Sequence, residues 1–322
     1  MDTVDLNETE CHFNWKLRHY PCYKECAALE EKFRMKLSPR DPDPNSYDPK
    51  WALRLSLAYE LFHLGRKNDA LEQGELAISE LAGMDYLSSC EHILYSVLAI
   101  MRKDMGIDIQ PMVERITPLR RMNDLEKAGV FGNQAVILRI YGPQEAVKGI
   151  KVLRSAIRLD PNQREWKISL LSLSRNRNHW KNRNRKLGSR NTLESMAEEL
   201  QLIDNLMSIY PIGSDVLYYD ARAFADLAAS ENVQEKADGH RERVTCDCRR
   251  IVDLGTTSPP VIAFCSEWFC SLPSSDDREL GCRMLLEGFE RLPKNKHFIK
   301  AGRQLLRLNL PQSRKEDLRS FL

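Results

Sequence analysis

The chain has 322 residues, of which 42% are hydrophobic and 29% are charged, and its formal net charge is +2. A chain this apolar is not intrinsically disordered and is long enough for one large core or a stacked repeat array. The near-neutral balance excludes a global field that would recruit nucleic acid, so any basic surface must be local.

The ends and the cysteines indicate where the protein works. Residues 1–7 are acidic and polar, and no later segment approaches about eighteen uninterrupted apolar residues. We therefore expect neither secretion nor a membrane span. The nine cysteines are an odd number, and several, such as Cys90 and Cys265, lie in apolar helical patterns where a reduced thiol packs as a small hydrophobe. This usage favours the cytosol.

The remaining cysteine spacings do not predict a metal. Cys22 and Cys26 are separated by three residues, and Cys246 and Cys248 by one, whereas zinc modules use a two-residue spacing or paired histidines. We predict no metal and no cofactor.

Residues 1–37 are predicted to form an N-terminal helical cap region. The block Glu10–Leu17 places His12 and Lys16 four residues apart, and Phe13 and Trp15 supply apolar bulk for a neighbouring helix to cover. We expect this block to form the first turns of a helix. A proline-rich insert follows at residues 38–50.

From residue 51 onward the pattern is that of helical repeats. Small residues stand where the two helices of a tetratricopeptide unit touch and turn, at Leu57-Ala58, Gly65, Ala70, Gly74 and Ala77. The same order of small, large, small and proline residues occurs at Gly149, Leu153, Ala156 and Pro161, and again 132 positions later at Gly281, Leu285, Gly288 and Pro293.

Two further groups of residues lie between these ladders. Ile203, Leu206 and Pro211 mark the end of the second helix of one repeat, and Leu217, Ala221 and Phe224 mark the first helix of the next repeat. We predict an all-α fold in which residues 51–322 form a right-handed tetratricopeptide-repeat α-superhelix of about four to seven repeats. Its concave face is the expected binding surface.

Three segments interrupt the rhythm and are predicted to be loops or linkers, namely residues 38–48, 176–191 and 230–239. The second contains a basic loop, placed at 175–190, with seven Lys or Arg residues and no acid: Arg175, Arg177, Lys181, Arg183, Arg185, Lys186 and Arg190. Arginine, asparagine and the indole of Trp180 are the mixture that single-stranded RNA binding uses. A solvated loop and a site for an acidic protein partner are the alternatives.

The letters of several blocks resemble one known family. Cys11-His12-Phe13-Asn14-Trp15 is similar to the Cys-His-Phe-Thr-Trp block that opens proteins of the interferon-induced tetratricopeptide-repeat (IFIT) family, and Ser56–Tyr59 with His63–Gly65 resembles its first repeat. Ala156–Pro161 looks like part of its later repeats. The resemblance covers nearly the whole chain, and it implies a diverged member that stops short of the C-terminal repeats of the vertebrate members.

The resemblance implies a cytosolic, interferon-induced antiviral protein whose superhelix holds the 5′ end of single-stranded RNA in a basic tunnel, without catalysis. Arg139 matches a tunnel lysine of the family, and Arg175, or Arg177, matches a tunnel arginine that contacts the 5′ phosphates. Ala135 stands where cap-binding members carry tryptophan. Phe264 is the one aromatic residue left on the RNA path near residue 260, and Phe298 replaces a histidine.

The predicted RNA-binding residues are therefore Arg139, Arg175, Arg177, Trp180, Lys181 and Phe264. Phosphate-binding glycine loops, nucleophile elbows and metalloprotease motifs are missing from the sequence, so we predict no enzyme. The histidines at 12, 63, 92 and 297 are read as packing residues.

The alternative function is a scaffold that binds proteins, including related repeat proteins. An inner face carrying Arg139, Arg175, Lys148 and Arg303 together would favour RNA. An inner face lined by Tyr218, Tyr219 and Phe224 would favour a protein ligand.

Overall fold

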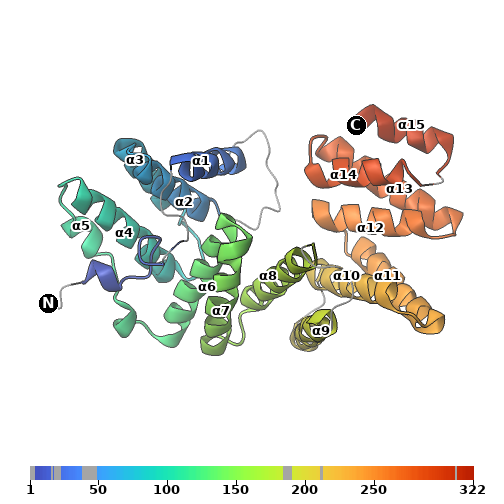
Figure 1. The fold of residues 1–322 in the computed structure, drawn as a ribbon, viewed down its shortest axis with the longest axis horizontal. Helices are drawn as coiled ribbons and strands as arrows, with labels where there is room; N and C mark the ends of the chain where they lie inside the picture. The colour runs from blue at the N-terminus through green and yellow to red at the C-terminus, as the bar shows by residue number, and fades with distance from the viewer. Residues whose placement is uncertain are drawn as a thin grey trace. The chain divides into compact units, whose positions relative to one another are not determined.

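A computed structural model of the chain describes residues 4–15, 17, 23–37, 49–183, 191–210, 213–308 and 310–322. Within these ranges the side chains of residues 23, 24, 143, 176–183 and 191–196 are outside the description. All regular structure in the described ranges is helical, with fifteen α-helices and two 3₁₀ helices (Figure 1). The predicted all-α repeat class is confirmed. The chain divides into two compact units, unit 1 ending at Ser189 and unit 2 beginning at Arg190.

Unit 1 contains two 3₁₀ helices, η1 (Leu6–Glu8) and η2 (Leu119–Arg121), and eight α-helices. These are α1 (Tyr23–Leu37), α2 (Lys50–His63), α3 (Lys67–Ser79), α4 (Leu87–Asp104), α5 (Gln110–Val113), α6 (Asp124–Tyr141), α7 (Pro143–Leu159) and α8 (Arg164–Arg183). The closest pairs are α2 with α3 and α6 with α7, while α1 packs on α2 and α8 packs on α7.

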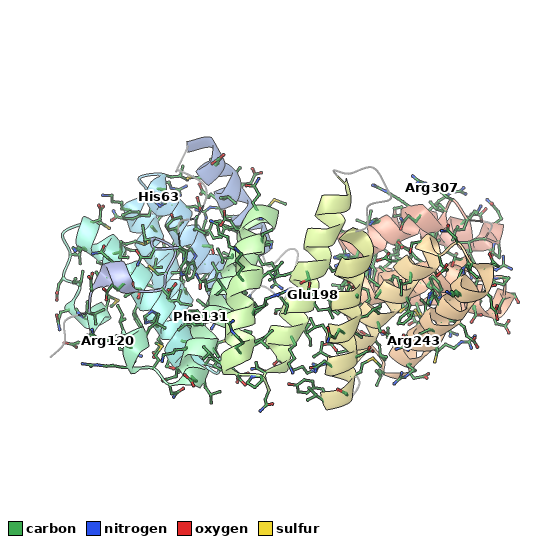
Figure 2. The ribbon with its side chains drawn as sticks, turned by 60° about the horizontal axis from the view of Figure 1, so that its bottom comes forward. His63, Arg120, Phe131, Glu198, Arg243 and Arg307 are labelled. Carbon is green, nitrogen blue, oxygen red and sulfur yellow. The ribbon has the colours of Figure 1, made fainter. Side chains whose placement is uncertain are left out.

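Unit 2 contains α9 (Asn191–Ile209), α10 (Ser214–Ser230), α11 (Gln234–Asp253), α12 (Pro259–Ser271), α13 (Ser275–Arg291), α14 (Lys296–Leu305) and α15 (Gln312–Phe321). Here α10 pairs with α11 and α12 with α13, and α14 lies against α12. Figure 2 draws the side chains, with Arg243 of α11 and Arg307, which follows α14, labelled in this unit.

The first predicted repeat is the α2–α3 pair. Gly65 has a φ of +78°, the left-handed conformation that glycine adopts without steric cost, and it turns the chain between the two helices. Ala70 and Ala77 are fully buried on α3. A Cβ atom at Gly74 would lie 2.4 Å from Leu98 Cδ2 of α4, so this small residue is required where the two helices meet.

The recurring ladder of small and large residues also lies at helix contacts. A Cβ atom at Gly149 of α7 would lie 3.2 Å from the Ala135 carbonyl oxygen of α6. The corresponding atom at Gly281 of α13 would lie 2.8 Å from the Ser266 carbonyl oxygen of α12. The two glycines therefore hold equivalent places in their helix pairs, as the identical spacing predicts.

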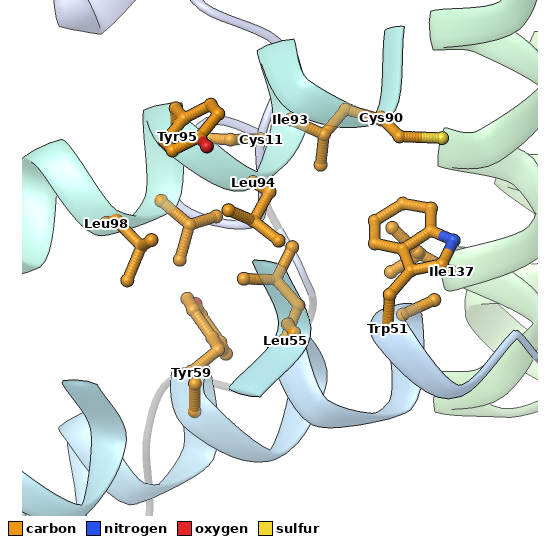
Figure 3. Close-up of a cluster of buried hydrophobic side chains, with 14 of the residues drawn as sticks. Cys11, Trp51, Leu55, Tyr59, Cys90, Ile93, Leu94, Tyr95, Leu98 and Ile137 are labelled. Carbon is orange, nitrogen blue, oxygen red and sulfur yellow. The ribbon is translucent and has the colours of Figure 1, made fainter. Parts of the chain in front are cut away.

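The core of unit 1 forms where α2, α4 and α6 meet (Figure 3). Trp51 and Leu55 of α2, Leu94 of α4 and Ile137 of α6 are each no more than 1% exposed. Cys11, from the N-terminal block, belongs to the same cluster. Burying such side chains contributes on the order of 1.5 to 3 kcal/mol each, so this cluster is the main support of the unit.

The N-terminal block is not a helix as predicted. After the short helix η1, residues 11–15 form turns. The side-chain Nδ2 of Asn14 donates to the backbone carbonyl oxygens of Leu6 at 2.9 Å and of Thr9 at 2.6 Å. These two hydrogen bonds fold the segment back on itself. Although the segment is not helical, the rings of Phe13 and Trp15 still pack against other residues of unit 1.

His12 is the centre of this block and is fully buried. Its Nε2 lies 3.2 Å from Ser56 Oγ, and its ring centroid lies 5.1 Å from that of Trp15 and 5.5 Å from that of Tyr59. The Glu10 backbone N–H donates to Nε2 of His92 at 3.2 Å. His12 and His92 are thus packing residues, as predicted, and they fix the block to α2 and α4.

Two predicted loops are largely helical. Helix α8 continues to Arg183, so residues 175–183 of the predicted basic loop are helix. The segment 230–239 is reduced to a three-residue connection, because α10 ends at Ser230 and α11 begins at Gln234. Both segments contain helix-forming Arg, Lys, Glu or Ala residues, and a helix started by buried residues continues through them. The proline-rich segment 38–48 and residues 184–190 lie outside the described residues.

Candidate nucleic-acid interface

The two arginines predicted to contact phosphate lie on α6 and α8 of unit 1. Helix α6 begins at a capping box, in which the Asn123 side chain accepts from the Glu126 backbone N–H at 2.9 Å and Glu126 Oε2 accepts from the Asn123 backbone N–H at 2.9 Å. Arg139 is in the last turn of this helix and is half-buried. Arg175 of α8 is also half-buried and directly follows buried Ser174.

Ala135 has a structural role that the sequence did not reveal. It is fully buried on α6, and its carbonyl oxygen and Cα face Gly149 of α7. This position belongs to the contact between two paired helices. Because Ala135 is fully buried, a tryptophan at this position would overpack the interior.

Three of the predicted RNA-binding residues can be placed only by their backbone. Arg177, Trp180 and Lys181 belong to the last turns of α8, and their side chains lie outside the described residues. In a helix of 3.6 residues per turn, Trp180 and Lys181 stand three and four residues after Arg177, so the three positions are neighbours on one side of α8.

Phe264 of α12 belongs to a group of half-buried residues on α10 and α12 that we call the arginine–aromatic cluster: Tyr218, Tyr219, Arg222 and Phe264. The Arg222 guanidinium carbon lies 5.5 Å from the centre of the Tyr218 ring and 5.9 Å from that of Phe264. Its Nη1 donates to the Tyr218 hydroxyl at 2.7 Å. Tyr218 and Phe264 meet edge to face at 5.6 Å.

The cluster combines a fixed positive charge with partly exposed ring surface. A guanidinium over an aromatic face is attracted by the ring quadrupole, and the hydrogen bond to Tyr218 holds its plane. Tyr219, 5.4 Å from Tyr218, extends the aromatic surface along α10. Such an arrangement can stack a base and attract a phosphate.

Glu267, one turn after Phe264, adds a carboxyl group to the same helix. Burial raises its pKa, and the charges of Lys300 and Arg222 partly offset this effect. Arg222 and Lys300 are therefore the cations whose charges act on this carboxyl.

The residues proposed to distinguish RNA from protein ligands do not form two clear groups. Lys148 donates to Glu145 Oε2 at 2.7 Å. Lys148 lies on α7, the second helix of its pair, and so is not on α6 or α8 with the two predicted phosphate-binding arginines. Phe224 packs toward α11, where Arg243 lies 4.5 Å from its ring centre, whereas Tyr218 packs toward α12. The expected lining by Tyr218, Tyr219 and Phe224 is thus divided between two faces of α10.

Arg222 and Lys300 were missed by reasoning from the sequence. The signal for Arg222 is present, since Tyr218 and Arg222 are four residues apart on one helix and such pairs meet on the surface. The contact of Arg222 with Phe264 leaves no signal in the sequence. The two residues are 42 positions apart, and only the packing of α10 on α12 brings them together.

Unit 2 also contains an ionic centre on the α11 side of α10, made of two buried carboxyl groups and the exposed Arg243. Asp220 is fully buried, and Arg243 donates to its Oδ2 from Nε at 3.0 Å and from Nη2 at 2.9 Å. The carboxyl of Asp247, 3% exposed, lies beside that of Asp220. Burial, the hydrogen bond that its protonated form makes with Asp220, and the charge of Asp220 raise the pKa of Asp247 to about 7.

Neither a protein-family model nor a curated protein sequence matches the chain. Among solved structures, the human IFIT1 dimer with m7Gppp-AAAA aligns with a TM-score of 0.59 and 14% sequence identity, over 98% of this chain and 66% of that chain. The chain shares its fold with human IFIT1. The human IFIT1 dimer with PPP-AAAA aligns over 98% of this chain and 74% of that chain, with 14% identity and a TM-score of 0.44.

The resemblance to the IFIT family is thus confirmed at the level of the fold. The chain spans 66% of the length of the IFIT1 chain in the capped-RNA structure. Among the described residues, none of the helices has both the length and the apolar character needed to cross a bilayer.

Proposed function

We propose that this protein binds the 5′ region of single-stranded RNA on the first helices of its repeat pairs, without catalysing a reaction. The observation that carries the proposal is the arginine–aromatic cluster, where Arg222 is held over Tyr218 and Phe264. Base stacking on aromatic rings and phosphate attraction by arginine are the two interactions that single strands require. The fold shared with human IFIT1, whose structure contains m7Gppp-AAAA, supports the same proposal.

Arg139 and Arg175 are proposed to supply phosphate contacts in unit 1. Both are half-buried, so their side chains are partly fixed while part of each remains accessible. Partial fixing reduces the entropy lost on binding, and a hydrogen bond from arginine to phosphate is charge-assisted. Arg177, Trp180 and Lys181 continue this basic segment along α8 and are proposed to contact the strand beyond its first nucleotides.

The biological setting is also part of the proposal. A cytosolic role in antiviral innate immunity, with interferon-induced expression, is what the family resemblance implies. Related repeat proteins are proposed partners, because repeat arrays present faces that a second array can cover. The competing proposal is a scaffold that binds a peptide or helix, and the aromatic surface of Tyr218 and Tyr219 is the feature that favours it.

The proposal is tested by titrating fluorescent RNA oligomers that carry a 5′-triphosphate, a cap or a 5′-hydroxyl, each at two salt concentrations. We expect binding that weakens with salt, by about 0.7 in the logarithmic slope for each phosphate contacted. Phe264→Ala should weaken binding by about 1 to 3 kcal/mol through the loss of one stacking surface.

The matched control is Arg241→Ala. Arg241 is an exposed arginine of α11 that pairs with Asp238 at 2.7 Å on the same helix, outside the arginine–aromatic cluster. Its removal should leave RNA affinity unchanged, whereas Arg222→Ala should lower it. Equal effects of Arg222→Ala and Arg241→Ala would show that only net charge matters and would contradict a site at the cluster.

A further inference from the structure

A pair of thiols joins α12 to α13 in unit 2. Cys270 lies one residue before the end of α12, and Cys282 lies in the second turn of α13. Their Sγ atoms are 3.7 Å apart, and the residues are 3% and 1% exposed. The two sulfurs are in contact, and a shift of about 1.7 Å would bring them to the bonded distance of about 2.05 Å.

Gly281 is what allows this contact. A Cβ atom on Gly281 would lie 2.7 Å from Cys270 Sγ and 2.8 Å from the Ser266 carbonyl oxygen. Any larger residue would displace α13 from α12 and separate the sulfurs. The small residue of the repeat ladder thus also determines the distance between the two thiols.

The two thiols have different surroundings. Cys282 lines a cavity of about 250 Å³, together with Arg278, Glu279 and Arg314, with Ser275 and with Leu310 and Pro311. Cys270 faces the helix contact instead, where its Sγ lies 3.6 Å from the Arg278 carbonyl oxygen. A small reagent that enters the cavity therefore reaches Cys282 first.

The hydrogen bond between the two thiols shifts their pKa values in opposite directions. It lowers the pKa of Cys282, and it raises that of Cys270, whose burial acts in the same direction. Cys90 of α4 has no such partner: burial raises its pKa to about 12, although the amide of Asn133 hydrogen-bonds its sulfur at 3.3 Å. A thiolate is the reactive form of cysteine, and the position of Cys282 at the cavity makes it the sulfur that a reagent meets, whereas Cys90 lines no such cavity among those described.

We propose that Cys270 and Cys282 form an oxidisable dithiol, in which Cys282 reacts with a small hydroperoxide and Cys270 closes a disulfide between α12 and α13. This proposal is independent of RNA binding. The sequence offered no hint of it, because the 12-residue spacing matches neither a redox motif nor a metal motif.

The reaction balances with hydrogen peroxide as the oxidant. The Cys282 thiolate attacks one peroxide oxygen, the O–O bond breaks, and the products are a Cys282 sulfenic acid and a hydroxide that takes up a proton to give water. The Cys270 sulfur then attacks the sulfenic sulfur, the S–O bond breaks, and the hydroxyl leaves as water with the proton of Cys270. Two thiols lose two electrons, and one peroxide becomes two waters.

The test uses the full chain, treated with hydrogen peroxide, alkylated to block remaining thiols, and analysed by intact mass and peptide mapping. We expect a mass loss of about 2 Da before alkylation, two fewer alkyl groups after it, and a linked pair of peptides that contain Cys270 and Cys282. In Cys270→Ser the sulfenic acid on Cys282 cannot be resolved, so oxygen adducts should accumulate there. In Cys282→Ser the Cys270 thiol should react no faster than Cys90.

Two controls distinguish this dithiol from general oxidation. Cys246 of α11 is exposed, and its reaction reports simple access. Cys248 and Cys265 are a second pair of fully buried cysteines, and we expect both to remain reduced after mild treatment and to be alkylated once the chain is unfolded. Oxidation confined to Cys246, or a link between Cys248 and Cys265 without one between Cys270 and Cys282, would overturn the proposal. Circular dichroism of each variant shows that the helices are intact.

Discussion

The two units bury polar groups in different ways. In unit 1, the centre around His12 consists of an imidazole, the Ser56 hydroxyl and the rings of Trp15 and Tyr59. In unit 2, the centre at Asp220 consists of two carboxyl groups and the guanidinium of Arg243. The first centre is held by packing and short-range contacts, whereas the second depends on the balance of charge. Stability should therefore respond to shape at the His12 centre and to protonation at the Asp220 centre.

The largest effect is expected for Arg243→Ala. Asp220 would lose both hydrogen bonds from Arg243 while remaining fully buried beside Asp247. The side chain of Arg243 is 43% exposed, so solvent screens part of its interaction with Asp220, and the free energy of unfolding should fall by about 1.5 to 3 kcal/mol at pH 8, as measured by urea denaturation. Adding Asp220→Asn should recover part of the loss, because the amide carries no charge. A double variant as unstable as Arg243→Ala would contradict this reading.

The pH dependence sharpens the comparison. In the folded protein the pKa of Asp247 is raised from its ordinary value of 3.8 to about 7, so between these values the folded state binds more protons than the unfolded state. Stability from this group is complete below about pH 4 and is lost as pH rises toward 7. Asp247→Asn should therefore flatten the decrease in melting temperature over this range. A decrease of the same size in Asp247→Asn would place its cause elsewhere.

In unit 1, shape should matter at Gly132 of α6. An added Cβ would lie 2.4 Å from the ring of Trp166 on α8, which is 6% exposed. Gly132→Ala should cost about 1 to 3 kcal/mol through overpacking, and the loss should be the same at pH 5 and pH 8 because no charge is involved. A loss that changes with pH would show that the two units do not differ as described.

The smallest effect is expected at Gly239, a glycine of α11 whose added Cβ would meet no atom within 4 Å. Here the only change is the lower conformational freedom of the unfolded chain, so Gly239→Ala should raise stability by about 0.5 to 1 kcal/mol. The same substitution thus has opposite signs at Gly132 and Gly239. A destabilising Gly239→Ala would contradict the open surroundings of this residue.

The repeat architecture could be predicted because it depends on local signals. Gly65 marks a turn with a positive φ, and Gly149 and Gly281 mark close helix contacts within ladders that share one internal spacing. The helix boundaries in the basic segment could not be predicted from the sequence, because the end of α8 depends on whether helical hydrogen bonding continues past the buried residues. Arg175 and Arg177, read as loop, therefore lie in a helix.

The candidate site was less predictable than the fold. Phe264 was identified from the family resemblance alone, and its contacts with Arg222 and Tyr218 join helices that are far apart in sequence. The N-terminal block shows the same limit, since its apolar spacing fits a helix while hydrogen bonds from Asn14 to Leu6 and Thr9 impose turns. Long-range packing and local side-chain bonds decide such cases, and a spacing rule contains neither.

RNA binding is tested most directly by the double charge reversal Arg139→Glu plus Arg175→Glu, compared with the unchanged protein in a titration of 5′-triphosphate single-stranded RNA at two salt concentrations. Each arginine should contribute about 1.5 to 3 kcal/mol through charge-assisted contacts, so the double variant should bind at least about a hundredfold more weakly and with a less steep salt dependence. Circular dichroism should show that both proteins are equally helical. Unchanged RNA affinity in the folded double variant would contradict the account and favour the protein-binding scaffold.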